Sequence, residues 1–326
     1  GGRGMRDEKE WGERDERAAP IPPSSLIPRP SPDGVLNLDK PAGMTSHDVV
    51  ARVRRALGTK RAGHAGTLDP DATGVLVVAV GQATRLLPYL PLEPKEYVAR
   101  LVLGVATNTE DAGGAVLAEA DAAHVTEDAL RNVLPRFVGE IDQVPPMVSA
   151  VHHEGRRLYE LAREGVTVGR APRRVRIHSV DLSDFTPGAR PEATVRVACG
   201  GGTYIRTLCA DIGAALGVPA HMKTLVREAV GPFRRRGALP LDRLADEGAA
   251  HLRPAESVLD APAVVVSDAD SERLGNGQSI SATGGVGASD LYALLHRGCL
   301  RALARREGGA FVPFRVFPAV APCDAP

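Results

Sequence analysis

The stretch RAGHAGTLDPDATGVLVVAVG, residues 61–81, decides the fold around it. Its first half, residues 61–74, predicts a tight loop, because glycine tolerates a positive φ and proline fixes φ. Its second half, residues 75–80, is an apolar and largely β-branched run that predicts a buried strand. The stretch therefore presents His64 and Asp69 on a stiff loop leading into the core, and catalytic side chains often lie on such loops.

The same two residues have a structural interpretation. An Asp before a Pro in a glycine-rich turn usually binds nearby backbone N–H groups. A single His in such a loop is usually solvated or hydrogen-bonded in place. On local grounds alone, both a structural and a catalytic role stay open for Asp69 and His64.

Length and composition describe a globular protein with room for two domains, at 326 residues with 43% hydrophobic and 25% charged side chains. No apolar run approaches the roughly 18 residues of a membrane span, and the first 33 residues lack the apolar segment of a secretory signal. The four cysteines form no CxxC pair, which argues against a zinc site or a disulfide framework. We expect a cytoplasmic protein with no membrane partner.

The charge balance does not by itself predict a nucleic-acid partner. Forty Lys and Arg stand against 40 Asp and Glu, whereas an RNA-binding protein is expected to carry a basic face. The first 33 residues hold six basic and seven acidic side chains, which leaves 34 basic against 33 acidic. Basic residues do cluster, and these clusters would have to converge on one side: residues 52–61, 170–176 and 234–236.

The pattern of apolar residues predicts a disordered tail at 1–33, a main domain at 34–260, and a small β-rich domain at 261–326. Strands are expected at 35–38, 75–80, 95–103, 115–118, 174–182 and 193–199. Helices are expected at 46–57, with Ser46 as N-cap, and at 83–90, 126–137, 158–163 and 205–216. Without regular βαβ alternation, this order favours an α+β fold with a mixed, largely antiparallel central sheet and flanking helices.

Five segments, taken in order, resemble the TruB family of tRNA pseudouridine synthases. They are 34–41 (GVLNLDKP), 63–74 (GHAGTLDPDATG), 95–97 (KEY), 144–150 (VPPMVSA) and 202–207 (GTYIRT). The match covers roughly residues 34–260, and five ordered segments are more specific than any single motif. The resemblance implies a pseudouridine synthase fold and a monomer that isomerises a uridine in the T-loop of tRNA. In the family the C-terminal position commonly holds a PUA-like RNA-binding domain, and a plain stabilising appendage is the alternative for residues 261–326.

The resemblance also assigns the residues of the site. Asp69 corresponds to the catalytic residue, Arg206 to its partner, and Tyr97 to a Tyr that stacks on the target base. His64 corresponds to a His that inserts into the T-loop of the RNA. The remaining substrate-binding positions are Tyr204, Leu225, Lys40, Gly66 and Thr67.

These residue types suit the reaction. A carboxylate can attack a sugar or a base and can also move a proton, and the sequence leaves these three roles of Asp69 open. Arg206 would keep an enclosed Asp69 ionised, because a guanidinium stays charged and can bind a carboxylate through two hydrogen bonds. Flipping the base costs a few kcal/mol, of which stacking on Tyr97 returns about 1–3 kcal/mol. The isomerisation needs no cofactor or metal, and no nucleotide-binding or metal-binding motif is found.

Two positions depart from the family pattern. Glu228 lies in a run that is often more basic, and Asn108 lies where an Asp is common. One alternative is a tRNA-binding or tRNA-folding protein without turnover, although a pure binder needs no Asp beside its RNA. A glycoside hydrolase that uses Asp69 and Asp71 is disfavoured, since neighbours on one turn cannot flank a sugar.

Overall fold

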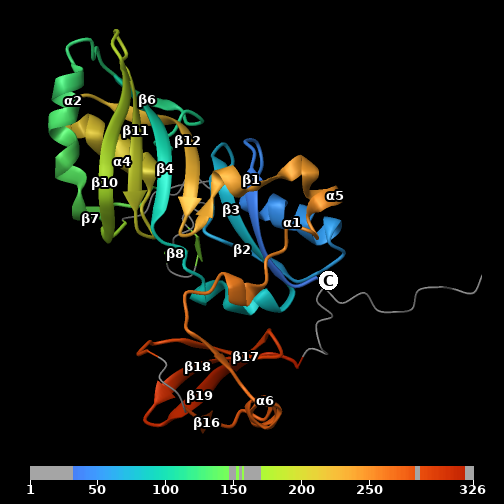
Figure 1. Ribbon diagram of the computed structural model, residues 1–326. Helices are drawn as coiled ribbons and strands as arrows, with labels where there is room; N and C mark the ends of the chain where they lie inside the picture. The colour runs from blue at the N-terminus through green and yellow to red at the C-terminus, as the bar shows by residue number, and fades with distance from the viewer. Residues whose placement is uncertain (1–31, 147–151, 154–155, 158–169, 283–286, 320–326) are drawn as a thin grey trace, which may run out of the picture. The chain divides into compact units, whose positions relative to one another are not determined.

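The structure is a computed structural model that describes residues 32–146, 152–153, 156–157, 170–282 and 287–319 (Figure 1). Ten strands form the main sheet: β1 Gly34–Lys40, β2 Ala62–Ala65, β3 Thr73–Val80, β4 Lys95–Leu103, β7 Gly139–Gln143, β10 Arg173–Thr186, β11 Glu192–Cys199, β12 Ala220–Val230, β13 Phe233–Arg234 and β14 Leu239–Pro240. Two-stranded sheets pair β5 Val105–Thr107 with β6 Val116–Glu119, and β8 His152–His153 with β9 Arg156–Arg157.

The helical elements are short. The α-helices are α1 Ser46–Ala56, α2 Glu127–Val133, α4 Ile205–Ala215, α5 Leu244–Glu247 and α6 Asp268–Gly275. The 3-10 helices are η1 Gly81–Tyr89, η2 Leu134–Phe137, η3 Arg235–Gly237, η4 Leu241–Arg243 and η5 Ala255–Ser257.

The main sheet has the order β14-β1-β3-β12-β4-β11-β10-β7, with β2 on β3 and β13 on β12. Only the β1–β14 and β3–β12 pairs are parallel, which confirms the predicted mixed, largely antiparallel α+β fold. The central strand β12 was not predicted. Its charged residues interrupt the apolar run, and one of them, Arg227, is buried in the sheet.

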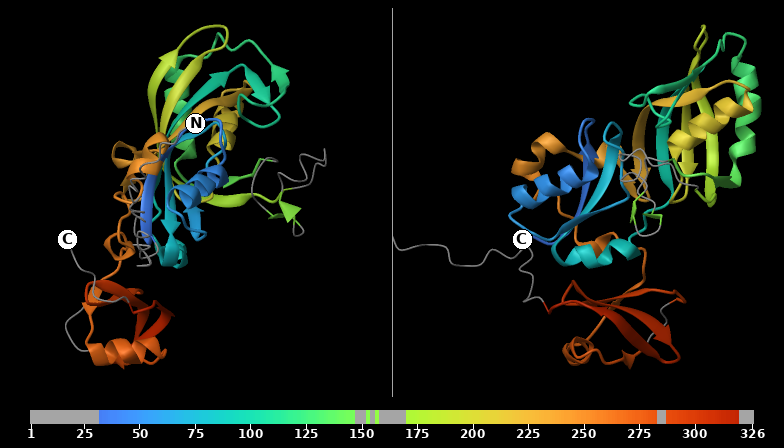
Figure 2. Two further views of the ribbon diagram at one scale, coloured as in Figure 1. Left: turned by 90° about the vertical axis from the view of Figure 1, so that its right-hand side faces the viewer. Right: turned by 180° about the vertical axis from the view of Figure 1, so that it is seen from behind.

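Helices cover this sheet where its strands present apolar side chains. Val49, Val50 and Val53 of α1 pack against β1 and β3 in one core cluster. Residues of α2 and α4 share a second cluster with β4, β10 and β11, and these helices lie on one face of those strands, as Figure 2 shows from behind. Strand β4 has the predicted bounds, and its inward residues alternate as predicted.

The N-terminus of α1 differs from the prediction. Thr45, not Ser46, is the N-cap: its hydroxyl accepts from the Asp48 N–H, and the Asp48 carboxylate accepts from the Thr45 N–H. This reciprocal pair is a capping box, and the predicted cap at Ser46 is wrong. Ser46 is instead buried, and its hydroxyl bonds to the backbone of Leu68.

The first half of the opening stretch is also more regular than predicted. Residues Ala62–Ala65 form strand β2, which pairs with β3 and places His64 opposite Val78. The prediction that His64 lies on a loop is therefore wrong, and the turn itself is confined to residues 66–72. The helix predicted at 158–163 lies outside the described residues, and the one predicted at 83–90 is the 3-10 helix η1.

The C-terminal residues form a separate five-stranded sheet, which confirms a β-rich C-terminal domain. Its strands, in spatial order, are β15 Ala263–Val265, β17 Tyr292–His296, β18 Cys299–Glu307, β19 Ala310–Val316 and β16 Ile280–Ser281. Strand β18 and helix α6 were not predicted. The exact domain limits and the PUA-like character stay predictions. Among the residues described, no helix is long and apolar enough to cross a membrane.

Candidate active site

Side chains from three separate elements hold the turn at residues 66–72 by its backbone. Arg227 of β12 donates to the carbonyls of Gly66 at 2.9 Å and Thr67 at 3.4 Å. The Ser46 hydroxyl of α1 accepts from the Leu68 N–H at 2.9 Å. Lys40, at the end of β1, holds the residues that follow Asp69. Asp69 therefore projects from a turn that is fixed on both sides of it.

The substrate-binding role of Lys40 stays a prediction, and the structure shows its contacts with the protein. Lys40 is fully buried and does not line the cavity described below. Its Nζ donates to the carbonyls of Pro41, Pro70 and Ala72 at 2.7–2.9 Å. Burial lowers the pKa of Lys40 to about 8, although the charges of Asp71 and Asp69 oppose this shift. The structure thus makes Lys40 a support for the turn rather than a group at the cavity.

Asp69 meets Arg206 although 137 positions separate them. Arg206 Nε lies 2.9 Å from Asp69 Oδ2, and its Nη2 donates to Asp69 Oδ1 at 3.3 Å. The guanidinium thus binds the carboxylate with both ends of its fork, which fixes orientation as well as charge. The Arg206 side chain is only 4% exposed, whereas Asp69 keeps 37% of its side chain open.

The helix start that carries Arg206 is fixed by a residue from another strand. Arg206 is the second residue of α4, and Tyr204, the N-cap, contributes no side-chain cap. Gln143 of β7 is buried; its Oε1 accepts from the Tyr204 N–H at 3.0 Å, and its Nε2 donates to the Tyr204 carbonyl at 3.2 Å. This double contact sets the position of both Tyr204 and the Arg206 that follows it.

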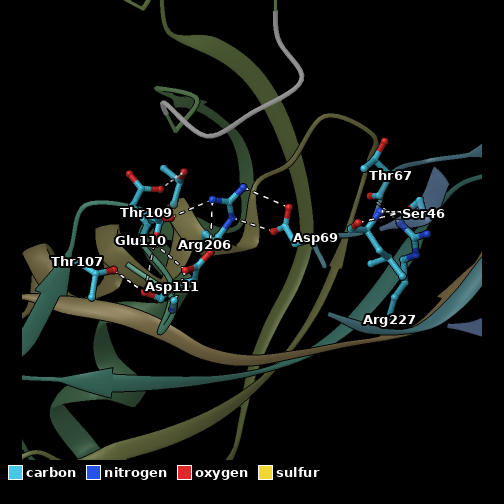
Figure 3. Close-up of polar contacts among 12 residues, drawn as sticks. Ser46, Thr67, Asp69, Thr107, Thr109, Glu110, Asp111, Arg206 and Arg227 are labelled. Carbon is cyan, nitrogen blue, oxygen red and sulfur yellow. Dashed lines mark hydrogen bonds and ion pairs between the residues drawn. The ribbon is translucent and has the colours of Figure 1, made fainter. Parts of the chain in front are cut away.

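The loop between β5 and β6 approaches Arg206 from the other side (Figure 3). Arg206 Nη1 donates to the Thr109 carbonyl at 2.9 Å and lies 3.6 Å from Asp111 Oδ2. Asp111 is held in turn by the Thr109 hydroxyl and the Gly113 N–H. Glu110 between them has φ 62° and accepts a hydrogen bond from Thr207. A single guanidinium is therefore shared by Asp69 and Asp111.

The electrostatics of Asp69 reflect this sharing. Burial raises the pKa of Asp69 above its usual 3.8, the Arg206 charge lowers it, and the Asp111 charge raises it again. The net direction is upward. Asp69 is thus an enclosed carboxylate beside a fixed cation, suited to attack or to proton transfer.

A cavity of about 270 Å³ opens in front of this pair. Tyr97 of β4 and Leu225 of β12 form part of its wall, and burial raises the pKa of Tyr97. Seven of the nine predicted site residues line it: Gly66, Thr67, Asp69, Tyr97, Tyr204, Arg206 and Leu225. The structure thus gathers residues from four segments of the sequence around one small space.

His64 and Lys40 are the two predicted residues that do not line the cavity. His64 is half-buried on β2; burial, together with the charges of Arg227 and His47, lowers its pKa. Six lining residues were not predicted as site residues, among them two cationic ones, Lys95 and Arg227. Lys95 stood in the quoted segment 95–97, two positions before Tyr97, so the strand period of two could have placed both on one face.

Both departures from the family pattern have local partners. Glu228 Oε1 lies 3.4 Å from Arg235 Nη1, which offsets its charge. Asn108 Oδ1 accepts from the Ala115 N–H at 2.8 Å and so closes the loop after β5. In the part of the chain that the structure describes, no group of three or more His, Cys, Asp or Glu side chains could hold a metal ion.

The sheet and the enclosed carboxylate–guanidinium pair define the class of protein as a pseudouridine synthase. A solved H/ACA ribonucleoprotein bound to a substrate RNA containing 2'-deoxyuridine includes a chain 29% identical to this one, with a TM-score of 0.65. The match covers 88% of this chain and 85% of that chain.

The particular family follows from the sequence comparisons. The model for the TruB family pseudouridylate synthase N-terminal domain matches residues 54–205, and that for the tRNA pseudouridylate synthase B C-terminal domain matches residues 206–262. A tRNA pseudouridine synthase B of Symbiobacterium thermophilum is 56% identical over 75% of this chain and 82% of its own length. A tRNA pseudouridine synthase B of Thermobifida fusca is 46% identical over 87% of this chain and 98% of its own length. The chain belongs to the TruB family of pseudouridylate synthases.

Proposed function

We propose that this protein converts one uridine in the T-loop of tRNA to pseudouridine. The curated relatives bear the name tRNA pseudouridine synthase B. The observation that carries the proposal is the pairing of Asp69 with Arg206 at a cavity sized for a single base. The proposal includes a monomer that acts in the cytoplasm on the T-arm, with a PUA-like C-terminal domain.

Asp69 is the group that carries the chemistry. The reaction breaks the bond from uracil N1 to ribose C1′, turns the base, and forms a bond from C5 to C1′. The C5 proton leaves and N1 gains one, so no electron donor or acceptor is needed. Asp69 can act on the sugar, on the base or on a proton, and each of these roles requires an ionised carboxylate.

Arg206 supplies the charge that keeps Asp69 ionised and in place. Its bidentate contact opposes the upward effect of burial on the Asp69 pKa. Contacts to Thr109 and Asp111 hold the guanidinium at its other end. A positioned, water-shielded charge of this kind contributes far more to a reaction than the same charge in water.

Tyr97 and Leu225 hold the flipped base. Both line the cavity from neighbouring strands β4 and β12. Stacking of about 1–3 kcal/mol per base on an aromatic ring offsets the cost of unstacking the nucleotide. His64 does not line the cavity, so its proposed contact with the RNA loop lies outside the base pocket. Gly66, Thr67 and Tyr204 complete the wall toward the substrate.

The test uses an unmodified T-arm stem-loop whose uridine carries tritium at C5. The wild-type protein, without added metal or nucleotide, is expected to release the tritium. Asp69→Asn keeps the shape of the side chain but removes its charge, so we expect release to stop while RNA binding persists. Normal release by this variant would reject Asp69 as the reacting group.

Asp71→Asn is the matched control, since Asp71 is exposed on the same turn. It should leave tritium release unchanged. Binding of the stem-loop by the wild-type protein without any release would instead favour the tRNA-binding alternative.

A further inference from the structure

Two cationic side chains converge on one part of the cavity wall. Lys95 lies two residues before Tyr97 on β4, so both side chains project to one face. Arg227 lies directly across from Tyr97 on β12. A Cβ placed on Gly66 would lie 3.5 Å from Arg227 Nη1 and 3.6 Å from Lys95 Nζ. Both nitrogens therefore approach the same point beside Gly66.

Neither cation at this point forms an ion pair in the described part of the chain. The Lys95 ammonium has no hydrogen-bond partner there, and the Arg227 guanidinium donates to the main-chain carbonyls of Val75, Gly66 and Thr67. Glu93, the acid nearest in sequence to Lys95, accepts a 2.6 Å hydrogen bond from the Gly201 N–H. Two like charges in an enclosed space destabilise each other until an anion joins them.

The neighbouring thiol and phenol add no negative charge at neutral pH, and Glu93 is a carboxylate whose charge does act on Lys95. Burial raises the pKa of the Cys199 thiol to about 11, so the thiol stays neutral. The Tyr97 pKa is raised as well, mainly by burial. Burial and then the Arg227 charge lower the pKa of Lys95, and the Glu93 charge opposes this shift only in part. Asp69, the carboxylate that lines the cavity, is engaged by Arg206, which also contacts Asp111 behind it.

We propose that Lys95, supported by Arg227, binds an anionic oxygen of the RNA substrate inside the cavity. This inference rests on the proposed function and adds a substrate contact to it. One source of the oxygen is the phosphate beside the flipped uridine. The other is a carbonyl oxygen of uracil, which gains charge when the N1–C1′ bond breaks and its electron pair moves onto the base. The ammonium donates a hydrogen bond in both cases, and no proton is transferred.

The experiment compares Lys95→Gln and Lys95→Arg with the wild-type protein on the tritiated T-arm stem-loop. It measures the single-turnover release rate at saturating protein and the dissociation constant of the RNA. A hydrogen bond to a charged group contributes enough that Lys95→Gln should lose about tenfold to a hundredfold in one of the two quantities. Lys95→Arg retains the charge and should recover most of the loss.

Lys223→Gln is the matched control, because Lys223 lies on β12 but is exposed and paired with Glu192. It removes one positive charge outside the cavity and should change either quantity by less than about threefold. The midpoint of thermal unfolding is measured for every variant, to show that Lys95→Gln is folded.

The two quantities separate the sources of the oxygen. A slower single-turnover rate with unchanged binding assigns the contact to uracil, and weaker binding with an unchanged rate assigns it to phosphate. Wild-type values of both in Lys95→Gln would overturn the inference, as would a Lys95→Arg variant as impaired as Lys95→Gln. Failure of the proposed function is distinct, since the wild-type protein itself would then release no tritium.

Discussion

Arg206 and Arg227 are two buried arginines that line the same cavity, yet carboxylates are among the partners of Arg206 alone. Arg206, from α4, contacts the carboxylates of Asp69 and Asp111. Arg227, from β12, is 1% exposed and donates to main-chain carbonyls of β3 and the Asp69 turn. The partners of a buried cation thus decide whether it serves chemistry or holds the fold together.

The position of Arg227 explains why its role is structural. The β3–β12 pairing is short and parallel, and it joins the two halves of the main sheet at Thr73–Val226 and Gly74–Arg227. Gly74 has φ 104°, and a Cβ there would collide with the Arg227 backbone. The Arg227 side chain extends from this junction to the turn that carries Asp69, so it connects the sheet to the site.

The largest effect on turnover after loss of Asp69 itself is expected from Arg206→Gln. The variant removes the charge that opposes the raised Asp69 pKa, and loss of a comparable preorganised donor costs about 10²–10³-fold in rate. Single-turnover tritium release measures the effect. Arg190→Gln, which breaks an exposed ion pair with Glu119, is the control and should be near wild type. Turnover by Arg206→Gln within threefold of wild type would show that Arg206, like Arg227, is structural.

A different loss is expected from Arg227→Met. One buried carbonyl (Val75) and two partly buried ones (Gly66 and Thr67) lose their donor, and leaving them unsatisfied should lower the free energy of unfolding by about 2–3 kcal/mol. Turnover should fall by about tenfold, less than for Arg206→Gln, because the Asp69 turn loses one of its three supports. Urea denaturation measures the first effect and tritium release the second. If Arg227→Met had wild-type stability and a release rate as low as that of Arg206→Gln, Arg227 would serve the reaction rather than the fold.

The sequence distinguishes these two arginines poorly. Arg206 was found because GTYIRT resembles a family motif, not because the chain shows which carboxylate it would meet. Arg227 stood in an apparently weakly basic run, and its partners lie 152–161 positions away. The periodicity of apolar residues reveals a buried position only when an apolar residue occupies it. A buried arginine on a strand therefore looks the same in the sequence as an exposed arginine.

The same reasoning explains which parts of the fold could be predicted. Strand β4 and the Thr126 cap of α2 follow from alternation and capping chemistry, which are local. Strand β12 was missed because Lys223, Arg227 and Glu228 hide its pattern. Lys40 was assigned to substrate because nothing local shows that its Nζ reaches the carbonyls of Pro70 and Ala72, 30 positions or more away.

The smallest effect is expected from Asp111→Asn, which alters the surroundings of Arg206 without removing it. The Asp111 charge raises the pKa of Asp69, so its removal should lower that pKa. Turnover requires ionised Asp69 and therefore falls as pH drops through the Asp69 pKa, which lies above 3.8. The acid limb of the rate profile should then move to lower pH. At neutral pH the rate should fall less than about tenfold, because a neutral amide can still meet the guanidinium.

Single-turnover release measured from about pH 4 to pH 8 tests this shift, with the exposed Asp184→Asn as control. Glu110 also lies near Arg206, and the Asp111 charge raises its pKa as well. The direction of the shift is thus the same whichever of the two carboxyl groups limits the rate. An acid limb that moves to higher pH would mean that Asp111 acts by holding Arg206 against Asp69, since a displaced guanidinium would leave the Asp69 pKa raised by burial alone. Arg206 would then depend on its second carboxylate for position, just as the Asp69 turn depends on Arg227.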